Sequence, residues 1–229
     1  MNEISIVIPV YNESSNISDL IIEIDNSLKN YSYEIVIIDD GSNDDTLSKI
    51  NILQQKYKIK LLKNQSNKGQ SFSIYKGVEN STNETIITID GDGQNNPKDI
   101  PKMIKYYKSK NNLSLLGGIR KKRIDSFIKI LSSRIANKVR SFILKDNCKD
   151  TGCSLKIFKK NIFLKIDYFD GMHRFLPALF LGLGYKTDFI EVGHRPRLKG
   201  VSKYGVFDRL FKGIYDLIKV KMIISKKRK

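Results

Sequence analysis

Three oxygen-bearing side chains stand close together in the middle of the chain, at Asp90, Asp92 and Gln94. The two carboxylates are two residues apart where an apolar run ends, so both can point the same way. Oxygen ligands without Cys or His suit Mg²⁺ or Mn²⁺, which proteins commonly hold with one or two carboxylates and substrate phosphates. We therefore expect these residues to bind a metal ion that carries a diphosphate. The alternative is that Asp and Gly only end a strand and form a turn.

Two acidic clusters follow apolar runs that are typical of buried parallel strands. Asp39 and Asp40 follow the run 35–38, and the cluster that begins at Asp90 follows the run 85–89. Ligands of open α/β sheets bind at the carboxyl ends of such strands, so both clusters should face one crevice.

The hydrophobic pattern predicts strands that alternate with helices, as in a doubly wound sheet. The chain has no Gly-x-Gly-x-x-Gly or Walker loop, which argues against dinucleotide dehydrogenases and P-loop enzymes. Strands are expected at 4–10, 33–39, 59–63, 84–90 and 113–118, and helices at 15–29, 43–57, 70–80 and 98–110.

Three motifs in a fixed order resemble a known family. They are Ile-Val-Ile-Pro-Val-Tyr-Asn-Glu at 6–13, Asp-Asp-Gly-Ser-Asn-Asp at 39–44 and Asp-Gly-Asp-Gly-Gln at 90–94. At these strand ends they resemble the nucleotide-sugar glycosyltransferases of family two. Four later segments resemble the dolichol-phosphate mannose synthase branch and its bacterial polyprenyl-phosphate relatives: 150–156, 171–177, 194–197 and 200–205.

The resemblance implies an α/β fold of the GT-A type, a Rossmann-like, mostly parallel central sheet flanked by helices, with an amphipathic C-terminal helix. It implies a single catalytic domain over residues 1–229. Within it we expect a nucleotide-sugar-binding half at 1–118, an acceptor-binding half at 119–205 and a basic amphipathic tail on the membrane surface at 206–229.

The resemblance also assigns roles to residues. Asp90, Asp92 and Gln94 would hold the metal, whose positive charge stabilises the departing diphosphate. Asp92, Arg120 and Asp150 are the expected catalytic residues: Arg120 would help to neutralise the same charge, and Asp150 would partner the basic acceptor-binding group without acting as a base. Arg120 can also be read as one member of a solvated basic run at 120–123. The nucleotide sugar would be bound by Pro9, Tyr11, Glu13, Asp39, Asp40, Asn67, Gly69 and Asp90.

Charge divides the chain into two unequal halves. Residues 1–110 hold 13 lysines, no arginine and 15 acids, a net charge of −2. Residues 111–229 hold 28 lysines and arginines and 9 acids, a net charge of +19. Arginine binds phosphate oxygens bidentately, so the second half is expected to seek phosphate. No nucleic-acid-binding signature is present, and nucleic acid is not an expected partner.

The expected acceptor is a polyprenyl or dolichyl phosphate. A phosphate monoester is already largely anionic at neutral pH, because its second pKa is about 6, so it can attack without a general base. Positioning and charge neutralisation would then supply the rate. The cations expected to bind the acceptor phosphate are Arg174, Arg195, Arg197 and Lys203.

Two stretches combine apolar residues at helical spacing with basic residues, one from Ile124 to Ile143 and one from Phe207 to Lys221. Such stripes face either a protein core or a membrane surface. No apolar run reaches the roughly 18 residues of a transmembrane helix. We expect a cytoplasmic protein bound peripherally to the cytoplasmic face of a membrane, by its amphipathic end or through a separate integral membrane subunit.

Together these features predict a metal-dependent, inverting transfer of a sugar from a nucleotide sugar to polyprenyl phosphate. The nearest resemblance favours mannose from GDP-mannose, with a UDP-sugar as the other possible donor. A soluble glycosyltransferase with a saccharide or protein acceptor, or a noncatalytic basic membrane-binding module, are the alternatives.

Overall fold

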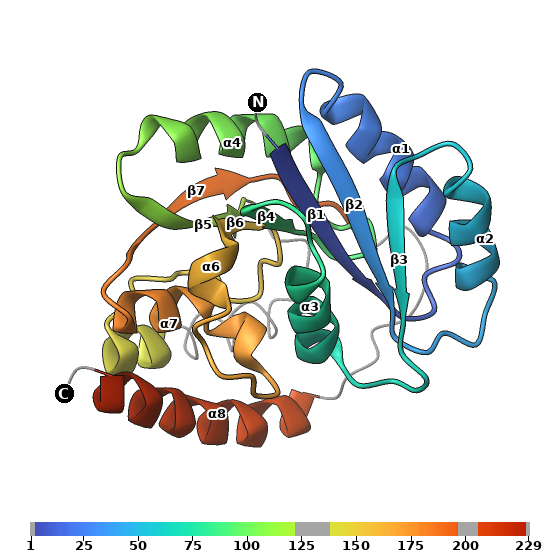
Figure 1. Ribbon diagram of the computed structural model, residues 1–229. Coiled ribbons are helices and arrows are strands. Elements are labelled where there is room, and N and C mark those ends of the chain that lie inside the picture. Colours follow the sequence, from blue (N-terminus) through green and yellow to red (C-terminus); the bar gives the residue numbers. More distant parts are fainter. Residues whose placement is uncertain (1–2, 122–137, 197–205, 228–229) are drawn as a thin grey trace.

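The computed structural model describes residues 3–121, 138–196 and 206–227, with side chains of the last range from Tyr215 to Lys226. Its centre is a seven-stranded sheet in the order β3-β2-β1-β4-β6-β5-β7 (Figure 1). The strands are β1 (Glu3–Val10), β2 (Ser32–Asp39), β3 (Ile59–Lys63), β4 (Thr85–Thr88), β5 (Leu113–Arg120), β6 (Lys156–Lys159) and β7 (Lys186–Val192).

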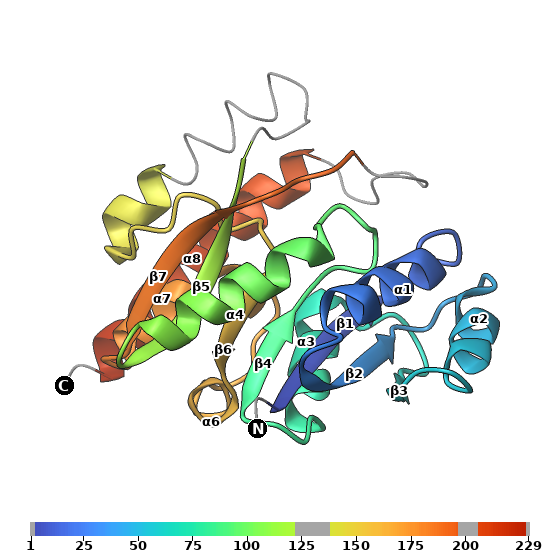
Figure 2. The same cartoon turned by 90° about the horizontal axis from the view of Figure 1, so that it is seen from above.

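Helices cover both faces of the sheet. Figure 2 looks onto α1 and α4, with α3 and α8 beyond the strands. The helices are α1 (Ile17–Ser27), α2 (Thr46–Leu53), α3 (Gln70–Glu79), η1 (Pro97–Asp99), α4 (Ile100–Ser109), α6 (Lys160–Phe163), η2 (Met172–Arg174), α7 (Leu176–Gly182) and α8 (Val206–Lys227).

Strand β1 shows why the sheet is buried on both sides. Its side chains alternate between two cores, because successive residues of a strand point to opposite faces. Ile6 and Ile8 pack with α1 and α4, whereas Val7 packs with α3 and the later helices. All three side chains are fully buried. An apolar run of this kind therefore specifies a central strand with helices on both faces.

The predicted doubly wound α/β sheet is confirmed. The five expected strands and four expected helices are present, although their ends differ by a few residues. The strand expected at 84–90 ends at Thr88, and the helix expected at 43–57 is shorter, at Thr46–Leu53.

Strands β6 and β7 were not expected from the sequence. β6 inserts between β4 and β5 and runs antiparallel to both, whereas β7 pairs in parallel with β5. β6 has only four residues, with lysine at each end, so its sequence carries almost no strand pattern. Its neighbours in the sheet, which are distant in sequence, supply the hydrogen bonds that make it a strand.

A further helical segment, at residues 138–144, lies next to α8. Val220 and Ile224 of α8 are buried in the same core as Leu144. None of the helices that the structure describes is long and apolar enough to cross a membrane.

Candidate functional site

The carboxyl ends of β2, β1 and β4 meet at one edge of the sheet, because these strands are parallel neighbours. Val10 at the end of β1 lies opposite Asp39 at the end of β2. Asp90 follows β4 by two residues. Strand order and register therefore bring the two acidic clusters to the same edge of the sheet, as expected.

Asp39 and Asp40 are both buried, but their carboxylates do different things. Asp40 accepts hydrogen bonds from Nδ2 of Asn64 at 2.7 Å and from the backbone N–H groups of Lys68 and Gly69 at 2.9 and 2.8 Å. These bonds hold the loop before α3. The carboxylate of Asp39 accepts a hydrogen bond from the backbone N–H of Ser42, at 3.3 Å.

The loop after β1 is held against the loop after β2. Asn12 has a positive φ of 54° and accepts a hydrogen bond from the backbone N–H of Asn43 at its side chain. The backbone N–H of Glu13 donates to Oγ1 of Thr46, and the buried Glu13 carboxylate accepts from Asn16. Pro9, Tyr11 and Asn67 border the same edge of the sheet, from the end of β1 and the loop before α3.

Asp90 is the most strongly perturbed acid at this edge. Removal from water and, second, repulsion by Asp92 raise the pKa of Asp90 to about 7, against the hydrogen bond from Ser154 and the charges of Lys156 and Arg120. Its carboxylate also accepts a hydrogen bond from Nε2 of Gln70 at 2.7 Å.

The loop after Asp90 packs tightly on β1. A Cβ atom at Gly91 would lie 2.7 Å from Cγ1 of Val10 and 3.3 Å from the carbonyl oxygen of Pro9. Farther along, the carboxylate of Asp92 accepts a hydrogen bond from the backbone N–H of Gln94 at 3.1 Å. A glycine at position 91 therefore lets the acidic loop lie against the end of the sheet.

Asp90 and Asp92 fit a divalent cation. The repulsion by Asp92 that raises the pKa of Asp90 is relieved when a cation lies between the two carboxylates, and oxygen ligands suit Mg²⁺ or Mn²⁺. Within the described ranges, no three side chains among His, Cys, Asp and Glu gather into a metal site. A metal ion here would thus take further ligands from other oxygen donors, such as Gln94, water or a diphosphate.

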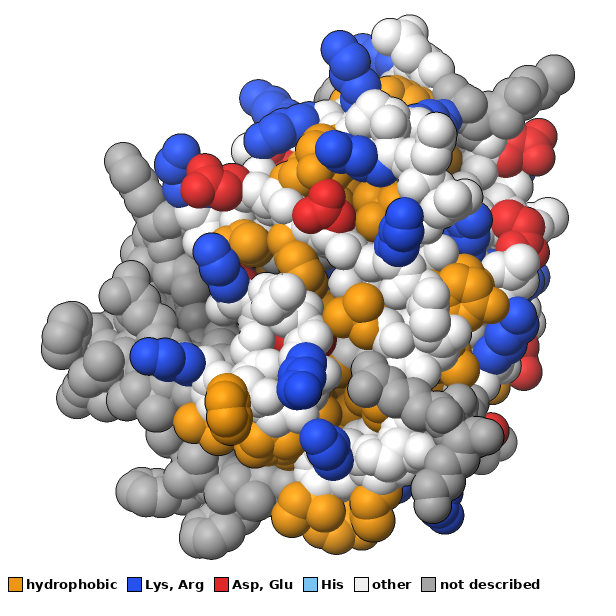
Figure 3. All heavy atoms as spheres, turned by 90° about the vertical axis from the view of Figure 1, so that its left-hand side faces the viewer, with side chains coloured by type: hydrophobic (Ala, Val, Ile, Leu, Met, Phe, Trp, Pro, Cys, Tyr) orange, Lys and Arg blue, Asp and Glu red, His pale blue; other side chains and the backbone are white. Residues whose placement is uncertain are grey.

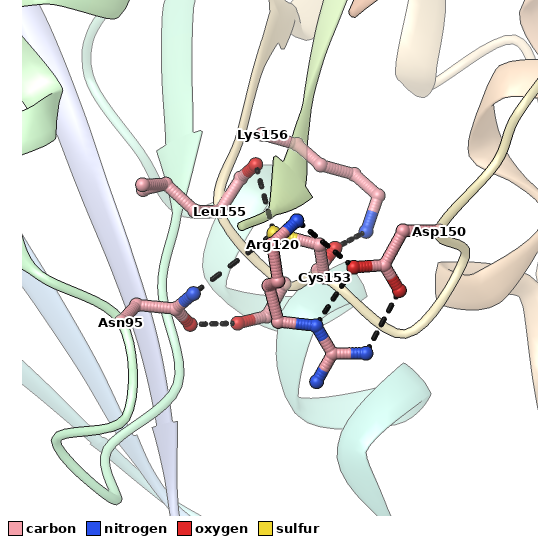
Figure 4. Close-up of polar contacts among 7 residues, drawn as sticks. Asn95, Arg120, Asp150, Cys153, Leu155 and Lys156 are labelled. Atoms are coloured by element: carbon pink, nitrogen blue, oxygen red, sulfur yellow. Dashed lines mark hydrogen bonds and ion pairs between the residues drawn. The ribbon is translucent and has the colours of Figure 1, made fainter. Parts of the chain in front are cut away.

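Arg120 and Asp150 form a buried ion pair beside this edge (Figure 4). Nε and Nη2 of Arg120 each donate to Asp150 at 2.8 Å, and the Arg120 side chain is only 13% exposed. A Cβ atom at Gly152 would lie 2.8 Å from Nη2 of Arg120. Arg120 is therefore not part of a solvated basic run, and its orientation is set by Asp150.

Lys156 brings a second buried cation to this region. Its side chain points from β6 toward the loop that carries Asp150, and Nζ donates a hydrogen bond to the carbonyl oxygen of Cys153 (Figure 4). The positive charges of Lys156 and Arg120 both lower the proton affinity of Asp90. Two buried cations, Arg120 and Lys156, therefore lie near the acidic edge, by which we mean the sheet edge that carries Asp39, Asp40, Asp90 and Asp92.

Arg195 was expected to bind the acceptor phosphate, and the structure shows which groups its guanidinium contacts. Nη1 and Nη2 donate to the two carboxylate oxygens of Glu23 on α1, at 2.9 and 2.7 Å. Nε donates to the carbonyl oxygen of Gly93 and Nη2 also to that of Asn95. The Arg195 side chain therefore connects α1 to the loop after Asp90, because it donates hydrogen bonds to both.

Asp150 and Arg174 each form an ion pair. Asp150, which we expected to partner the basic acceptor-binding group, pairs with Arg120, and Nη2 of Arg174 donates to Asp216 of α8 at 2.9 Å. Asp150 and Arg174 come from separate loops, whose placement no sequence pattern reveals. Arg197 and Lys203 lie outside the described residues.

Several residues that complete the site were not singled out from the sequence. Gln70 contacts Asp90 from the first position of α3, and Oγ of Ser154 donates to Oδ1 of Asn95 at 2.6 Å. Glu23 contacts the acidic loop through Arg195. Only Gln70 had a local signal, since it begins a helix after a glycine. The others are brought in by contacts between distant segments.

The chain belongs to glycosyl transferase family 2, because residues 5–167 match that family. It is 34% identical to a dodecaprenyl-phosphate galacturonate synthase of Rhizobium johnstonii, over 95% of this chain and 66% of the relative. It is 30% identical to an undecaprenyl-phosphate 4-deoxy-4-formamido-L-arabinose transferase of Aeromonas hydrophila, over 94% of this chain and 66% of the relative. The chain thus spans about two thirds of the length of these relatives.

The fold is shared with solved glycosyltransferase structures. A glucosyl-3-phosphoglycerate synthase from Mycobacterium tuberculosis, crystallised with Mn²⁺, UDP and phosphoglyceric acid, aligns with a TM-score of 0.73 at 14% identity. The alignment covers 97% of this chain and 78% of that one. The expected GT-A fold and family two membership are confirmed, and the polyprenyl-phosphate names of the two relatives agree with the expected bacterial branch.

Gly41 provides a stability test of the donor edge. It has a φ of +76°, and a Cβ atom there would lie 2.9 Å from the backbone carbon of Ser66. Gly41→Ala should lower the free energy of unfolding by about 2–4 kcal/mol, because the left-handed conformation and the backbone clash both cost energy. Gly184→Ala is the matched control: its φ is +83° with open space around it. It should cost only about 1–2 kcal/mol in urea unfolding. Equal losses would show that the close approach is unimportant.

The pKa of Asp90 predicts how metal binding depends on pH. A raised pKa means that Asp90 is neutral below about pH 7 and ionised above it. A cation needs the ionised form, so Mn²⁺ affinity should fall as pH falls, by about tenfold between pH 8 and pH 6. Electron paramagnetic resonance of free Mn²⁺ measures this. Asp92→Asn should move the titration of Asp90 to lower pH. An affinity that is the same at both pH values would contradict the assignment.

Proposed function

We propose that this chain is a metal-dependent glycosyltransferase that moves a sugar from a nucleotide sugar to a polyprenyl phosphate. The observation that carries the proposal is the Asp90 and Asp92 pair at the carboxyl end of β4, at the same sheet edge as Asp39 and near the positive charge of Arg120. Family 2 membership and the polyprenyl-phosphate names of the relatives support the reaction class.

The donor nucleotide would lie across the ends of β1 and β2. We assign direct contact with its base and ribose to Asp39, Pro9, Tyr11 and Glu13. Asp40 acts differently, because its carboxylate is occupied by the N–H groups of the loop at Asn67 to Gly69. It positions this loop, whose backbone lines the donor site.

Charge on the departing diphosphate would be stabilised by cations around the acidic edge. Asp90 and Asp92, with Gln94, would hold Mg²⁺ or Mn²⁺, which supplies Lewis-acid stabilisation of the leaving group when bound. Arg120 adds a positive charge, and Asp150 is the positioning residue that fixes its guanidinium. Lys156 contributes to the same potential from β6.

The acceptor phosphate requires no base, since it is already anionic at neutral pH. An attack by its oxygen on the anomeric carbon, opposite the diphosphate, would invert that centre. Arg174, Arg197 and Lys203 remain our candidates for binding the phosphate. Arg195 is assigned instead to holding the acidic loop, because Glu23 and two loop carbonyl groups occupy its donors.

For the donor, we favour a UDP-sugar over GDP-mannose. The two relatives are named for galacturonate and for a formamido-arabinose, and the mycobacterial structure contains UDP. Peripheral binding to the cytoplasmic face of a membrane, with or without a separate membrane subunit, is part of the proposal, because the acceptor is a lipid.

The division of labour between Asp39 and Asp40 is testable with two matched variants. Asp40→Asn weakens the acceptor of three hydrogen bonds and should lower the free energy of unfolding by about 1–3 kcal/mol. Asp39→Asn should lower it by less than about 1 kcal/mol and weaken UDP binding by about tenfold or more. Urea unfolding and calorimetric titration with UDP and Mn²⁺ measure the two effects. Stability loss at Asp39 with intact UDP binding would reverse the assignment.

The reaction is tested by transfer of labelled sugar from a panel of UDP- and GDP-sugars into organic-extractable lipid, with polyprenyl phosphate and Mn²⁺. One donor should label the lipid, and EDTA should abolish labelling. Asp92→Ala should lower the rate by about 10²–10³-fold, since it removes stabilisation of the leaving group.

Asp19→Ala, which removes an exposed acid on α1, is the control and should leave the rate unchanged. Label that appears only in a water-soluble product would indicate a soluble acceptor instead of a lipid. A chain that binds none of these donors would not be a glycosyltransferase of this kind.

A further inference from the structure

Two helices that are distant in sequence, the one at 138–144 and α8, lie against each other and form one surface. Nζ of Lys221 on α8 donates to the carbonyl oxygen of Ile143, in the helix at 138–144, at 3.1 Å. Leu144 and Val220 are buried in the same core. The two helices are therefore packed together, and their outer faces are continuous.

This outer face is unusually apolar. Phe142 is 84% exposed, and the large apolar side chains nearby on the same two helices are more than half exposed as well. We call the five side chains the docking face: Val139, Phe142, Tyr215, Ile218 and Met222. Nine large apolar side chains are exposed in the described part of the chain, and five of them lie on these two short segments. Such a concentration indicates an interaction surface.

The charged side chains around the docking face have one sign. In segments 138–149 and 215–226 the exposed charged residues are all lysines, whereas the two acids, Asp146 and Asp216, are buried and form ion pairs with arginines. The exposed lysines are Lys138, Lys145, Lys149, Lys221 and Lys226. Figure 3 shows orange apolar side chains along the lower part of one side of the molecule, with blue basic side chains between them.

We propose that the docking face inserts into the surface of an anionic lipid bilayer. This inference rests on the proposed function, since an enzyme whose acceptor is a membrane lipid must meet the bilayer. Apolar side chains at the level of the headgroups and lysines that contact anionic lipids stabilise such binding together. The surface involves the helix at 138–144 as much as α8, so the C-terminal helix alone does not account for it.

A second copy of this chain fits the docking face less well than an anionic bilayer does. A twofold-symmetric dimer through this face would place the lysines of one copy against those of the other, and like charges in contact oppose association. An anionic bilayer matches the same lysines with opposite charge. The charge pattern therefore favours a lipid surface over self-association.

Sedimentation of the full chain with vesicles tests the proposal, using phosphatidylcholine alone and phosphatidylcholine mixed with phosphatidylglycerol. The chain should bind the mixed vesicles far better than the neutral ones. The double substitution Phe142→Gln and Ile218→Gln should weaken binding by about tenfold or more. Ile52→Gln is the matched control, because Ile52 is 66% exposed on α2, away from the docking face. It should bind like the unaltered chain.

Two results would overturn the proposal. One is a double variant that folds, as judged by circular dichroism, and binds the vesicles as tightly as the unaltered chain. The other is a chain that is a dimer in solution and that the double substitution converts to a monomer, which would make this face a protein interface.

The activity assay separates this proposal from the proposed function. The double variant should keep its transfer rate on a short-chain, water-soluble prenyl phosphate and lose about tenfold or more on polyprenyl phosphate in vesicles. A chain that binds mixed vesicles in the expected way but transfers sugar to neither acceptor would support the docking face and refute the reaction. Equal losses on both acceptors would refute the docking role.

Discussion

Crowding of negative charge at one edge of the sheet is the constraint on which the rest of this structure depends. Parallel strands β2, β1 and β4 end side by side, and acidic residues follow two of them. Burying a carboxylate is costly unless donors or cations compensate it. Asp40 receives two backbone N–H groups and an amide, and Asp150 receives a guanidinium. Asp90 is removed from water and lies near Asp92, and these two effects together raise its pKa to about 7 despite its hydrogen bonds and the nearby cations.

The raised pKa of Asp90 gives the site its chemistry. A carboxyl group that is close to losing its proton at neutral pH gains most from a cation, so a metal and a diphosphate complete the site electrostatically. Arg120 and Lys156 stand behind the acids, where they lower the cost of negative charge. The same two cations favour the charge that develops on a departing diphosphate.

Residues after 150 form hydrogen bonds that hold the loops and helices of the first hundred residues in place. Ser154 contacts Asn95, and Arg195 connects the acidic loop to Glu23 of α1. Gly171 and His173, at the turn η2, both contact Ser71 near the start of α3. Arg174 of that turn pairs with Asp216 of α8. The helix that carries part of the docking face is therefore attached, through a turn and α3, to the side of the molecule that carries the donor edge.

Much of the donor half was predictable because its signals are local. Apolar runs that end in Asp39 and Asp90 identify buried strands, and parallel strands place their carboxyl ends together. Motif order alone indicated the family, and the division of charge indicated a basic second half. None of these signals depends on how distant segments meet.

The partners of the charged side chains were decided only by the tertiary structure. Arg120 and Arg195 are both arginines of the basic second half, and the sequence does not show their partners. In the structure Arg120 pairs with Asp150, and Arg195 pairs with Glu23 on α1. Asp39 and Asp40 are adjacent, yet Asp40 accepts hydrogen bonds from Asn64 and the loop before α3, whereas Asp39 accepts one from the backbone N–H of Ser42. β6 is a strand only because β4 and β5 offer it hydrogen bonds. The sequence determined which charged groups reach the sheet edge. The packing of distant segments decided which of these groups remain available for chemistry, because a guanidinium or carboxylate that forms an ion pair is oriented by its partner.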